Sequence, residues 1–84
     1  MYQIRIHRSA ARELEKLEPP IRRRIARAID RLAEDPRGRS TVKLRAADDL
    51  WRLRVGDYRV IYQVRGDALL VLVIRVRHRR DAYR

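Results

Sequence analysis

The chain has 84 residues, of which 22 are Lys or Arg and 11 are Asp or Glu, so its formal net charge at pH 7 is +11. Hydrophobic residues make up 45% of it, which is enough for one small core and too many for a disordered basic tail. The absence of cysteine excludes disulfides and thiolate metal sites, and the longest wholly apolar run, Ala68–Ile74, is too short to span a bilayer.

The first part of the chain predicts one strand and two helices. Apolar and polar residues alternate over Tyr2–His7, as they do in a strand. Ser9 is a suitable N-cap for a helix that ends before Pro19, because proline lacks an amide hydrogen. A second helix follows and is expected to end at residues 35–38, DPRG. The inward sides of the two helices carry apolar residues at helical spacing: Ala10, Leu14 and Leu17, then Ile21, Ile25, Ile29 and Leu32.

The segments Asp48–Val55 and Tyr58–Val64 predict a β-hairpin around Gly56-Asp57, a dipeptide suited to a tight two-residue turn. Such a turn sets Arg54 opposite Arg59. One face of the hairpin is then apolar and carries Trp51, Leu53, Val55, Tyr58, Val60 and Tyr62. The other face carries Arg52, Arg54 and Arg59. Like charges directly opposite each other destabilise a sheet, so we infer that an anionic ligand is the reason for them.

Ala68–Arg77 predicts the last strand, and Thr41–Ala46 is a further strand candidate. If residues 65–67 form a three-residue loop, the even positions of the last strand join the apolar face. These even positions are Ala68, Leu70, Leu72, Ile74 and Val76. The odd positions, which include Arg75 and Arg77, then join Arg54 and Arg59 on the basic face.

The elements together predict a single α+β domain over residues 1–84 with the order β-α-α-β-β-β. We expect an antiparallel, twisted sheet with the N-terminal helical hairpin packed on one face. The other face is expected to be open, concave and basic. A charge of +11 on so short a chain indicates a polyanionic partner, since a merely soluble surface explains it poorly.

The sequence lacks the motifs HExxH, GxGxxG, GxxxxGK[ST] and GxSxG, and its two histidines lack a carboxylate at ligand spacing. We therefore expect no metal and no cofactor. Arginine, tyrosine and one histidine remain as reactive groups. Arginine neutralises charge on phosphoryl oxygens, and RNA carries its own nucleophile, the 2′-OH. A protein that holds the RNA in line can thus cleave it without a metal.

The chain resembles the RelE branch of the RelE/ParE superfamily of type II toxins over almost its whole length. The resemblance rests on SAARELEKL, LAEDPRG, KLRAADDLWRLRVGDYRVIYQV and the ending VRHRRDAYR. It implies a fold like that of microbial ribonucleases. It also implies a cytoplasmic, ribosome-dependent mRNA interferase, an endoribonuclease that cuts the A-site codon by attack of the 2′-OH on the adjacent phosphate. Growth arrest would follow from inhibited translation.

The resemblance also implies roles for individual residues. Arg59 would stabilise the transition state, Arg79 would protonate the leaving group or bind phosphate, and Tyr83 would stack on the mRNA base. Arg52 and Arg54 occupy positions where a family member has lysines, one of them proposed as the general base. Arginine is a poor base at neutral pH, so either another group deprotonates the 2′-OH or cleavage is slower. Further RNA contacts are expected from Lys43, Arg45, Arg77, His78 and Arg80, and His78 has a suitable intrinsic pKa for proton transfer.

Two other functions remain open at this point. One is a ParE-type toxin that inhibits gyrase, which shares the fold; Arg59, Arg79 and Tyr83 argue against it. The other is a catalytically inactive member that binds RNA or the ribosome. In each toxin reading the implied protein partner is an acidic RelB-like antitoxin in a hetero-oligomeric complex, and no membrane partner is expected. The antitoxin segment would fold on binding and cover a large surface.

Overall fold

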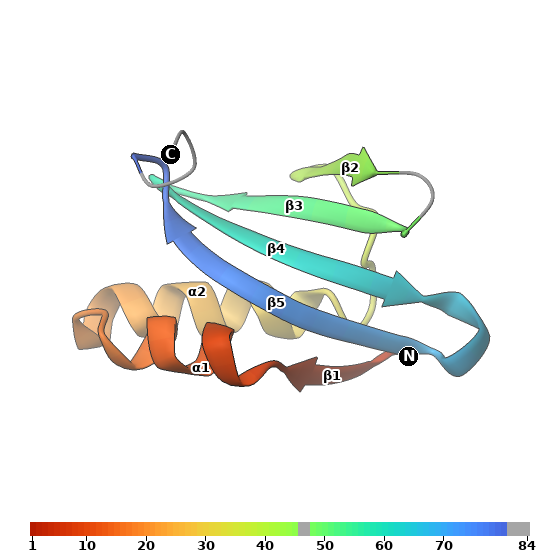
Figure 1. Cartoon of the computed structure of the whole chain (residues 1–84), viewed down its shortest axis with the longest axis horizontal. Helices are drawn as coiled ribbons and strands as arrows, with labels where there is room; N and C mark the ends of the chain where they lie inside the picture. The colour runs from red at the N-terminus through yellow and green to blue at the C-terminus, as the bar shows by residue number, and fades with distance from the viewer. Residues whose placement is uncertain (46–47, 81–84) are drawn as a thin grey trace.

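The computed structural model describes residues 1–45 and 48–80, and Figure 1 shows their arrangement. The elements in chain order are β1 (Gln3–Ile6), α1 (Arg8–Glu15), α2 (Pro19–Arg31), β2 (Thr41–Arg45), β3 (Leu50–Val55), β4 (Tyr58–Arg65), a 3₁₀ turn (Gly66–Ala68) and β5 (Leu70–His78). The α+β class and the order of elements are as predicted, with Thr41–Arg45 as a fifth strand. No helix in the described ranges is long and apolar enough to cross a membrane.

The strands form one sheet in the order β1-β5-β4-β3-β2. All neighbours are antiparallel except β1, which pairs with β5 in parallel. The prediction of a fully antiparallel sheet is therefore wrong for this edge. Its cause is the path of the chain, since the helical hairpin carries it from β1 to β2 at the opposite edge of the sheet (Figure 1). This leaves β1 beside the last strand and running in the same direction.

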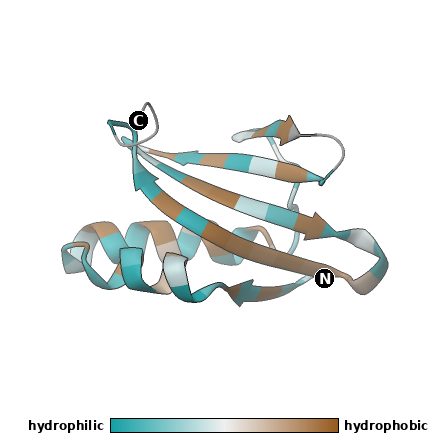
Figure 2. Cartoon of the chain, in the orientation of Figure 1, coloured by the Kyte–Doolittle hydropathy of each residue, from teal (hydrophilic) through white to brown (hydrophobic). Residues whose placement is uncertain are grey.

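Both helices pack on one face of the sheet, and the core lies between the two layers (Figure 1). The predicted stripes are confirmed, because Ala10, Leu14, Ile25, Ile29 and Leu32 are all buried. Their partners in the sheet are Leu53, Val55, Val60, Tyr62, Val64, Val71, Val73 and Val76. Figure 2 shows the matching alternation of hydropathy along β3 and β4. Each fully buried aliphatic side chain contributes roughly 1.5–3 kcal/mol.

The β3–β4 hairpin follows the predicted register, with Arg54 opposite Arg59 and Val55 opposite Tyr58. Gly56 has a φ of 59°, a left-handed conformation that glycine adopts without the steric cost of a side chain. The alternation then holds along both strands. The apolar face points to the helices and the arginine-bearing face points away from them, as predicted.

The prediction for β5 is wrong over its first half. Val71 and Val73 are buried there, not Leu70 and Leu72. Tyr62 pairs with Val73 whereas the preceding Ile61 pairs with Arg75, so Ile74 is an extra residue in the ladder. Such a β-bulge reverses the alternation of side chains beyond it. For this reason Val76 is buried and Arg77 lies opposite Arg59, as the sequence predicted for the second half.

The start of α1 also differs from the prediction, because His7 caps the helix and not Ser9. The His7 ring nitrogen Nδ1 accepts a hydrogen bond from the Ser9 backbone N–H at 3.2 Å. The Ser9 hydroxyl instead donates to the carbonyl of Ile74 at 3.0 Å. Ser9 thus fastens α1 to the bulged residue of β5.

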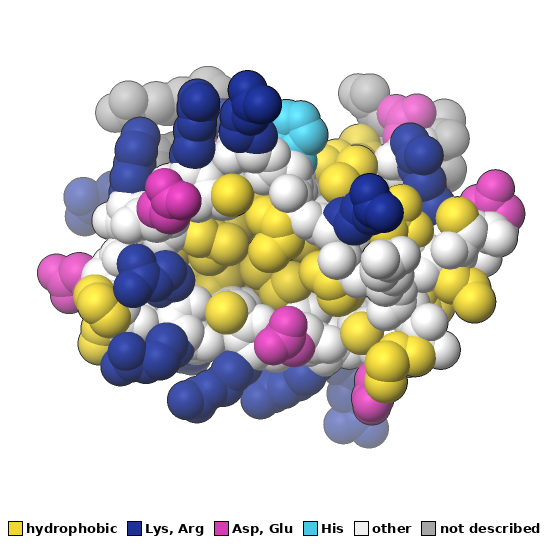
Figure 3. Space-filling view, turned by 90° about the horizontal axis from the view of Figure 1, so that it is seen from below, with side chains coloured by type: hydrophobic (Ala, Val, Ile, Leu, Met, Phe, Trp, Pro, Cys, Tyr) yellow, Lys and Arg dark blue, Asp and Glu magenta, His cyan; other side chains and the backbone are white. Residues whose placement is uncertain are grey.

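Seen from the helix side in Figure 3, apolar side chains fill the middle of the surface, and most of the charged side chains around them are Lys or Arg. The excess of positive charge is therefore spread over several elements.

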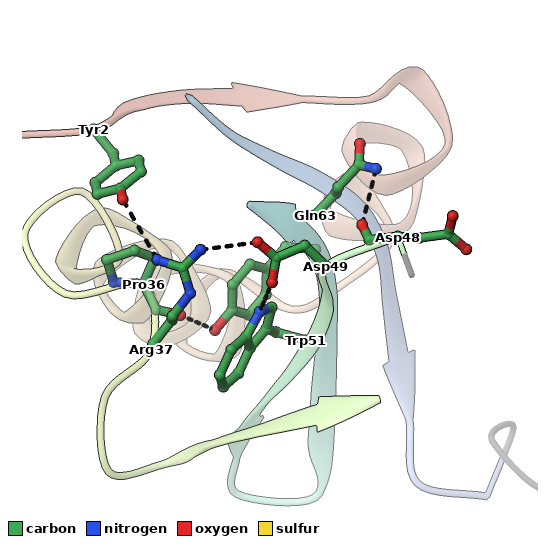
Figure 4. Close-up of polar contacts among 8 residues, drawn as sticks. Tyr2, Pro36, Arg37, Asp48, Asp49, Trp51 and Gln63 are labelled. Carbon is green, nitrogen blue, oxygen red and sulfur yellow. Dashed lines mark hydrogen bonds and ion pairs between the residues drawn. The ribbon is translucent and has the colours of Figure 1, made fainter. Parts of the chain in front are cut away.

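A polar cluster closes the end of the sheet near β1 (Figure 4). Asp49 accepts a hydrogen bond from the Trp51 indole N–H at 2.6 Å and a charged one from Arg37 at 2.8 Å. Arg37 also donates to the Tyr2 hydroxyl at 3.5 Å, and the Tyr62 hydroxyl donates to the Pro36 carbonyl. These bonds connect the residue before β1, the loop after α2, and strands β3 and β4. The Trp51 bond, followed by the Arg37 bond, holds the pKa of Asp49 below its usual value.

We expect this cluster to make stability depend on pH. The Asp49 carboxyl binds a proton less readily in the folded state than in the unfolded chain. The stabilisation that ionised Asp49 gives the folded state is therefore complete above the unfolded pKa, and it is lost as pH falls through the folded pKa. Asp49→Asn, which tolerates the left-handed φ of 49°, should lose about 1 kcal/mol near neutral pH. Urea unfolding followed by Trp51 fluorescence between about pH 6 and about pH 3 measures this. The exposed Asp67→Asn serves as control, and an equal pH dependence in wild type and Asp49→Asn would contradict the assignment.

Candidate functional site

The sheet face opposite the helices carries arginines from three adjacent strands. Arg54 of β3, Arg59 of β4 and Arg77 of β5 occupy one row, since each is the register partner of the next. In the next row Arg52 and Arg75 lie on either side of Ile61. We call these five residues the arginine face: Arg52, Arg54, Arg59, Arg75 and Arg77. Arg54 is exposed and the other four are half-buried, so the helices do not seal this surface.

Arg79 extends the arginine face at one end. Its backbone N–H donates to the Asp57 carbonyl at 2.7 Å, which brings the chain after β5 back to the β3–β4 turn. A hollow of about 350 Å³ lies there, lined by Arg54, Gly56, Asp57, Arg59 and Arg79. Two arginines of the hairpin and one from the distant chain end after β5 thus line one hollow. Guanidinium groups bind phosphate oxygens through two parallel hydrogen bonds, so this hollow is suited to a phosphate.

An acidic residue of α1 lies beside two members of the arginine face. Glu13 of α1 lies 3.6 Å from Arg75 and 3.5 Å from Arg77, measured from its Oε2 to each Nε atom. Arg54 donates to the Gly56 carbonyl at 3.3 Å. In the part of the chain that the structure describes, Arg52 and Arg54 have no ion pair. Glu13 therefore offsets charge at the α1 side of the arginine face.

Two predicted RNA-contacting residues lie on the helix side of the sheet. Lys43 is the register partner of Trp51, and its ammonium lies 5.7 Å from the centre of the Trp51 ring. His78 is the partner of Tyr58, and the two rings meet edge to face at 5.1 Å. Strand alternation separates both from Arg59, because their register partners Trp51 and Tyr58 lie on the opposite face of the hairpin from Arg59.

The remaining predicted residues are placed as follows. Arg45 pairs with Leu50 through the backbone at the end of β2. Arg80 is exposed, and its backbone N–H donates to Nδ1 of His78 at 3.2 Å. Tyr83 lies outside the described residues. Tyr62 points into the core as predicted, and burial raises its pKa to about 12.

Comparison with known proteins now assigns the family. The family model described as "ParE toxin of type II toxin-antitoxin system, parDE" matches residues 4–83. The chain belongs to this family. Its relatives are RelE-like toxins. A putative RelE-like toxin protein of Escherichia coli is 31% identical and covers 98% of this chain and 90% of its own. The toxin RelG of Mycobacterium tuberculosis is 31% identical, with 99% and 97% covered.

The fold agrees with solved structures of such toxins. In the archaeal RelE–RelB complex of Pyrococcus horikoshii, the matching chain is 31% identical and has a TM-score of 0.84, with 93% of this chain and 94% of that chain covered. The two helices and the five-stranded mixed sheet of this toxin are thus those of RelE structures.

One residue of the site, Glu13, was not predicted from the sequence. Its Oε1 accepts a hydrogen bond from the Val76 backbone N–H at 2.8 Å, beyond the end of β1, where β5 has no strand neighbour on that side. Its Oε2 meets the two arginines. A feature that could have indicated this role is the difference in strand length: β1 has four residues and β5 has nine, so part of the β5 edge has no strand partner. Buried backbone N–H groups require partners, so a side chain beside the uncovered part of β5 is expected.

The two interactions of Glu13 are separable by mutation. Glu13→Gln retains an oxygen for the Val76 N–H but removes the charge, and exposed ion pairs contribute about 1 kcal/mol at most. Glu13→Ala removes both and leaves that N–H without an acceptor, which costs roughly 1–3 kcal/mol. We therefore expect Glu13→Ala to be clearly less stable than Glu13→Gln in urea unfolding. Glu15→Gln, exposed on the same helix, is the matched control for charge; equal stability of the two Glu13 variants would refute the role of the Val76 bond.

Proposed function

We propose that this toxin is a metal-independent endoribonuclease that cleaves mRNA in the ribosomal A site. The observation that carries the proposal is the row of Arg54, Arg59 and Arg77 on an uncovered sheet face, with Arg79 beside it. A protein that bound no anion would gain nothing from like charges in register. The kinship with RelE-like toxins supports RNA as the anion.

In this mechanism the toxin positions a phosphodiester and stabilises the charge that develops on it. The 2′-OH of one nucleotide loses its proton and attacks the adjacent phosphorus, and the bond to the 5′ oxygen of the next nucleotide breaks. The products are a 2′,3′-cyclic phosphate and a 5′-hydroxyl, whose proton comes from solvent or the ribosome. Arg59 neutralises the growing negative charge on the phosphoryl oxygens. Arg79, across the hollow, holds the phosphate or the leaving oxygen, and Arg52 and Arg54 hold the strand. By the family resemblance, Tyr83 stacks on a base.

The proton of the 2′-OH leaves to a group outside the arginine face. Arginine remains protonated at neutral pH, so Arg52 and Arg54 are binding groups and not bases. We expect the ribosome or solvent to accept this proton, which is consistent with an enzyme that depends on the ribosome.

Substitution of Arg59 tests the site directly. Arg59→Ala should reduce A-site cleavage by about 100-fold or more, the usual cost of removing one transition-state donor. Arg12→Ala, exposed on α1, removes the same charge far from the arginine face and should cleave like wild type. The measurement is mapping of mRNA 5′ ends after brief induction, with growth as a second readout. Full activity of Arg59→Ala together with Tyr83→Ala would remove the proposed site.

Induction of the wild-type toxin also distinguishes the other functions when DNA breaks and ribosome binding are measured beside mRNA 5′ ends. New mRNA 5′ ends support the nuclease. DNA double-strand breaks with intact mRNA indicate a toxin that inhibits gyrase, and ribosome binding without new 5′ ends indicates an inactive member.

His78 provides a test of where the proton goes. Because it packs against Tyr58 on the helix side, His78→Gln should cleave at nearly the wild-type rate. Loss of a true general base typically costs at least about 100-fold. The single-turnover cleavage rate on programmed ribosomes distinguishes these outcomes. A loss of that size in His78→Gln would identify His78 as the general base and contradict the proposal that the base lies outside the toxin.

The expected protein partner is an acidic RelB-like antitoxin in a hetero-oligomeric complex. The related archaeal structure is a complex of RelE with RelB, which supports this partner. An acidic segment that covered the arginine face would compete with RNA for the same guanidinium groups.

A further inference from the structure

The hollow beside Arg59 continues around the edge of the sheet. A second hollow is lined by Arg39, Ser40, Val42, Arg52 and Arg54, together with the turn residues Gly56 and Asp57. A third, of about 480 Å³, lies between α2 and β3. Arg54 and Gly56 line all three. The three hollows therefore adjoin one another around Arg54 and Gly56, from the arginine face to the side of α2.

The third hollow is lined by five arginines, which we call the α2 groove: Arg24, Arg27, Arg31, Arg39 and Arg54. Three of them belong to α2 at positions i, i+3 and i+7, which place them along one side of the helix. All five are exposed. The floor of the groove is apolar and includes Ala28, Leu32 and Leu53.

Arg24 connects the α2 groove with the hairpin turn. Its guanidinium nitrogen Nη1 lies 3.4 Å from the point that a Cβ would occupy on Gly56. Because Gly56 has no side chain, the guanidinium lies against the turn backbone. Arg24 of α2 and Arg54 of β3 therefore both lie beside the hairpin turn.

Among the described residues, the α2 groove is lined by many more basic side chains than acidic ones. Asp35 is the one acidic residue among those that line it in the described part of the chain. The ion pairs that the structure describes do not involve any of the five arginines. Like charges one turn apart destabilise a helix, so an anion that binds along this side would relieve the repulsion.

We propose that the α2 groove binds the phosphate backbone of the RNA strand whose scissile phosphate lies at the arginine face. This inference rests on the proposed function, because it takes RNA as the ligand. A polymer with one charge per nucleotide matches a depression lined by arginines along its length, and the apolar floor accepts ribose or base surfaces. The groove then lengthens the bound strand by several phosphates beyond the reactive one.

The test compares Arg24→Gln/Arg27→Gln/Arg31→Gln with a control that loses the same charge, Arg8→Gln/Arg12→Gln/Arg23→Gln. The control arginines are exposed on the helices and outside the three hollows. Binding of the full chain to single-stranded RNA of about four and about twelve nucleotides is measured over a range of salt concentrations. Far-UV circular dichroism confirms that both variants are folded.

We expect wild type and control to bind the longer RNA more tightly and with a steeper salt dependence than the shorter one. The α2 variant should bind the short RNA with the same affinity as the control. It should not bind the long RNA more tightly than the short one. Its log–log salt slope for the long RNA should be less steep by about two, because each phosphate contact contributes about 0.7. Equal length dependence in the two variants would overturn the inference.

Two further measurements exclude other occupants. If the α2 variant loses affinity for ribosomes but keeps the length dependence, the groove binds ribosomal RNA and the inference fails. If it loses affinity only for a poly-glutamate peptide, the groove is a site for an acidic protein and the inference also fails. RNA binding is measured without cleavage. If the wild-type toxin cleaves no mRNA, the result counts against the nuclease and leaves the groove untouched. If the wild-type toxin cleaves mRNA but the α2 variant keeps the length dependence, the result counts against the groove alone.

Discussion

The structure depends on one constraint, which is that the β3–β4 hairpin holds Arg54 and Arg59 directly opposite each other. Repulsion between them acts against this register, and an exposed guanidinium would otherwise turn away into solvent. The register is maintained by the opposite face of the same two strands, where Val60 and Tyr62 are fully buried under the helices. Since a shift by one residue would expose that entire apolar set, the free energy of the core outweighs the repulsion on the other side. Hydrophobic burial thus supplies the rigidity that the proposed phosphate site requires.

The edge beside α1 adjusts how strongly that site is charged. The bulge at Ile74 exchanges the faces of β5 midway, so that an apolar first half packs in the core while Arg75 and Arg77 reach the arginine face. Ser9 binds the bulged residue, and Glu13 occupies the uncovered strand edge two residues on. One carboxylate therefore completes the hydrogen bonding of β5 and offsets charge on the outermost strand. Arg52 and Arg54, which have no ion pair among the described residues, lie on the other side of the face from this carboxylate.

The sequence predicted those features that follow from local pattern. Alternation and the Gly56-Asp57 turn were sufficient for the hairpin, its faces and the convergence of Arg54 and Arg59. The features that it did not predict depend on contacts between distant segments. A bulge leaves no trace in the run of aliphatic residues before Arg75, because every register of such a run looks equally apolar. The parallel pairing of β1 and the role of Glu13 likewise arise from which edge of the sheet is left uncovered. The position of His78 on the helix side agrees with the alternation predicted for the second half of this strand, where even positions join the apolar face.

Arginine in place of lysine changes which part of the reaction this chain can perform. A lysine near other cations has a lowered pKa and can exchange protons, whereas arginine at Arg52 and Arg54 keeps its charge and offers a planar pair of donors. Under the proposed function, these positions would bind phosphate and would not transfer protons. The proposed enzyme would then contribute positioning and electrostatic stabilisation and would obtain the base from its surroundings. Dependence on the ribosome would have a chemical basis in this mechanism, because the ribosome would supply the group that accepts the proton.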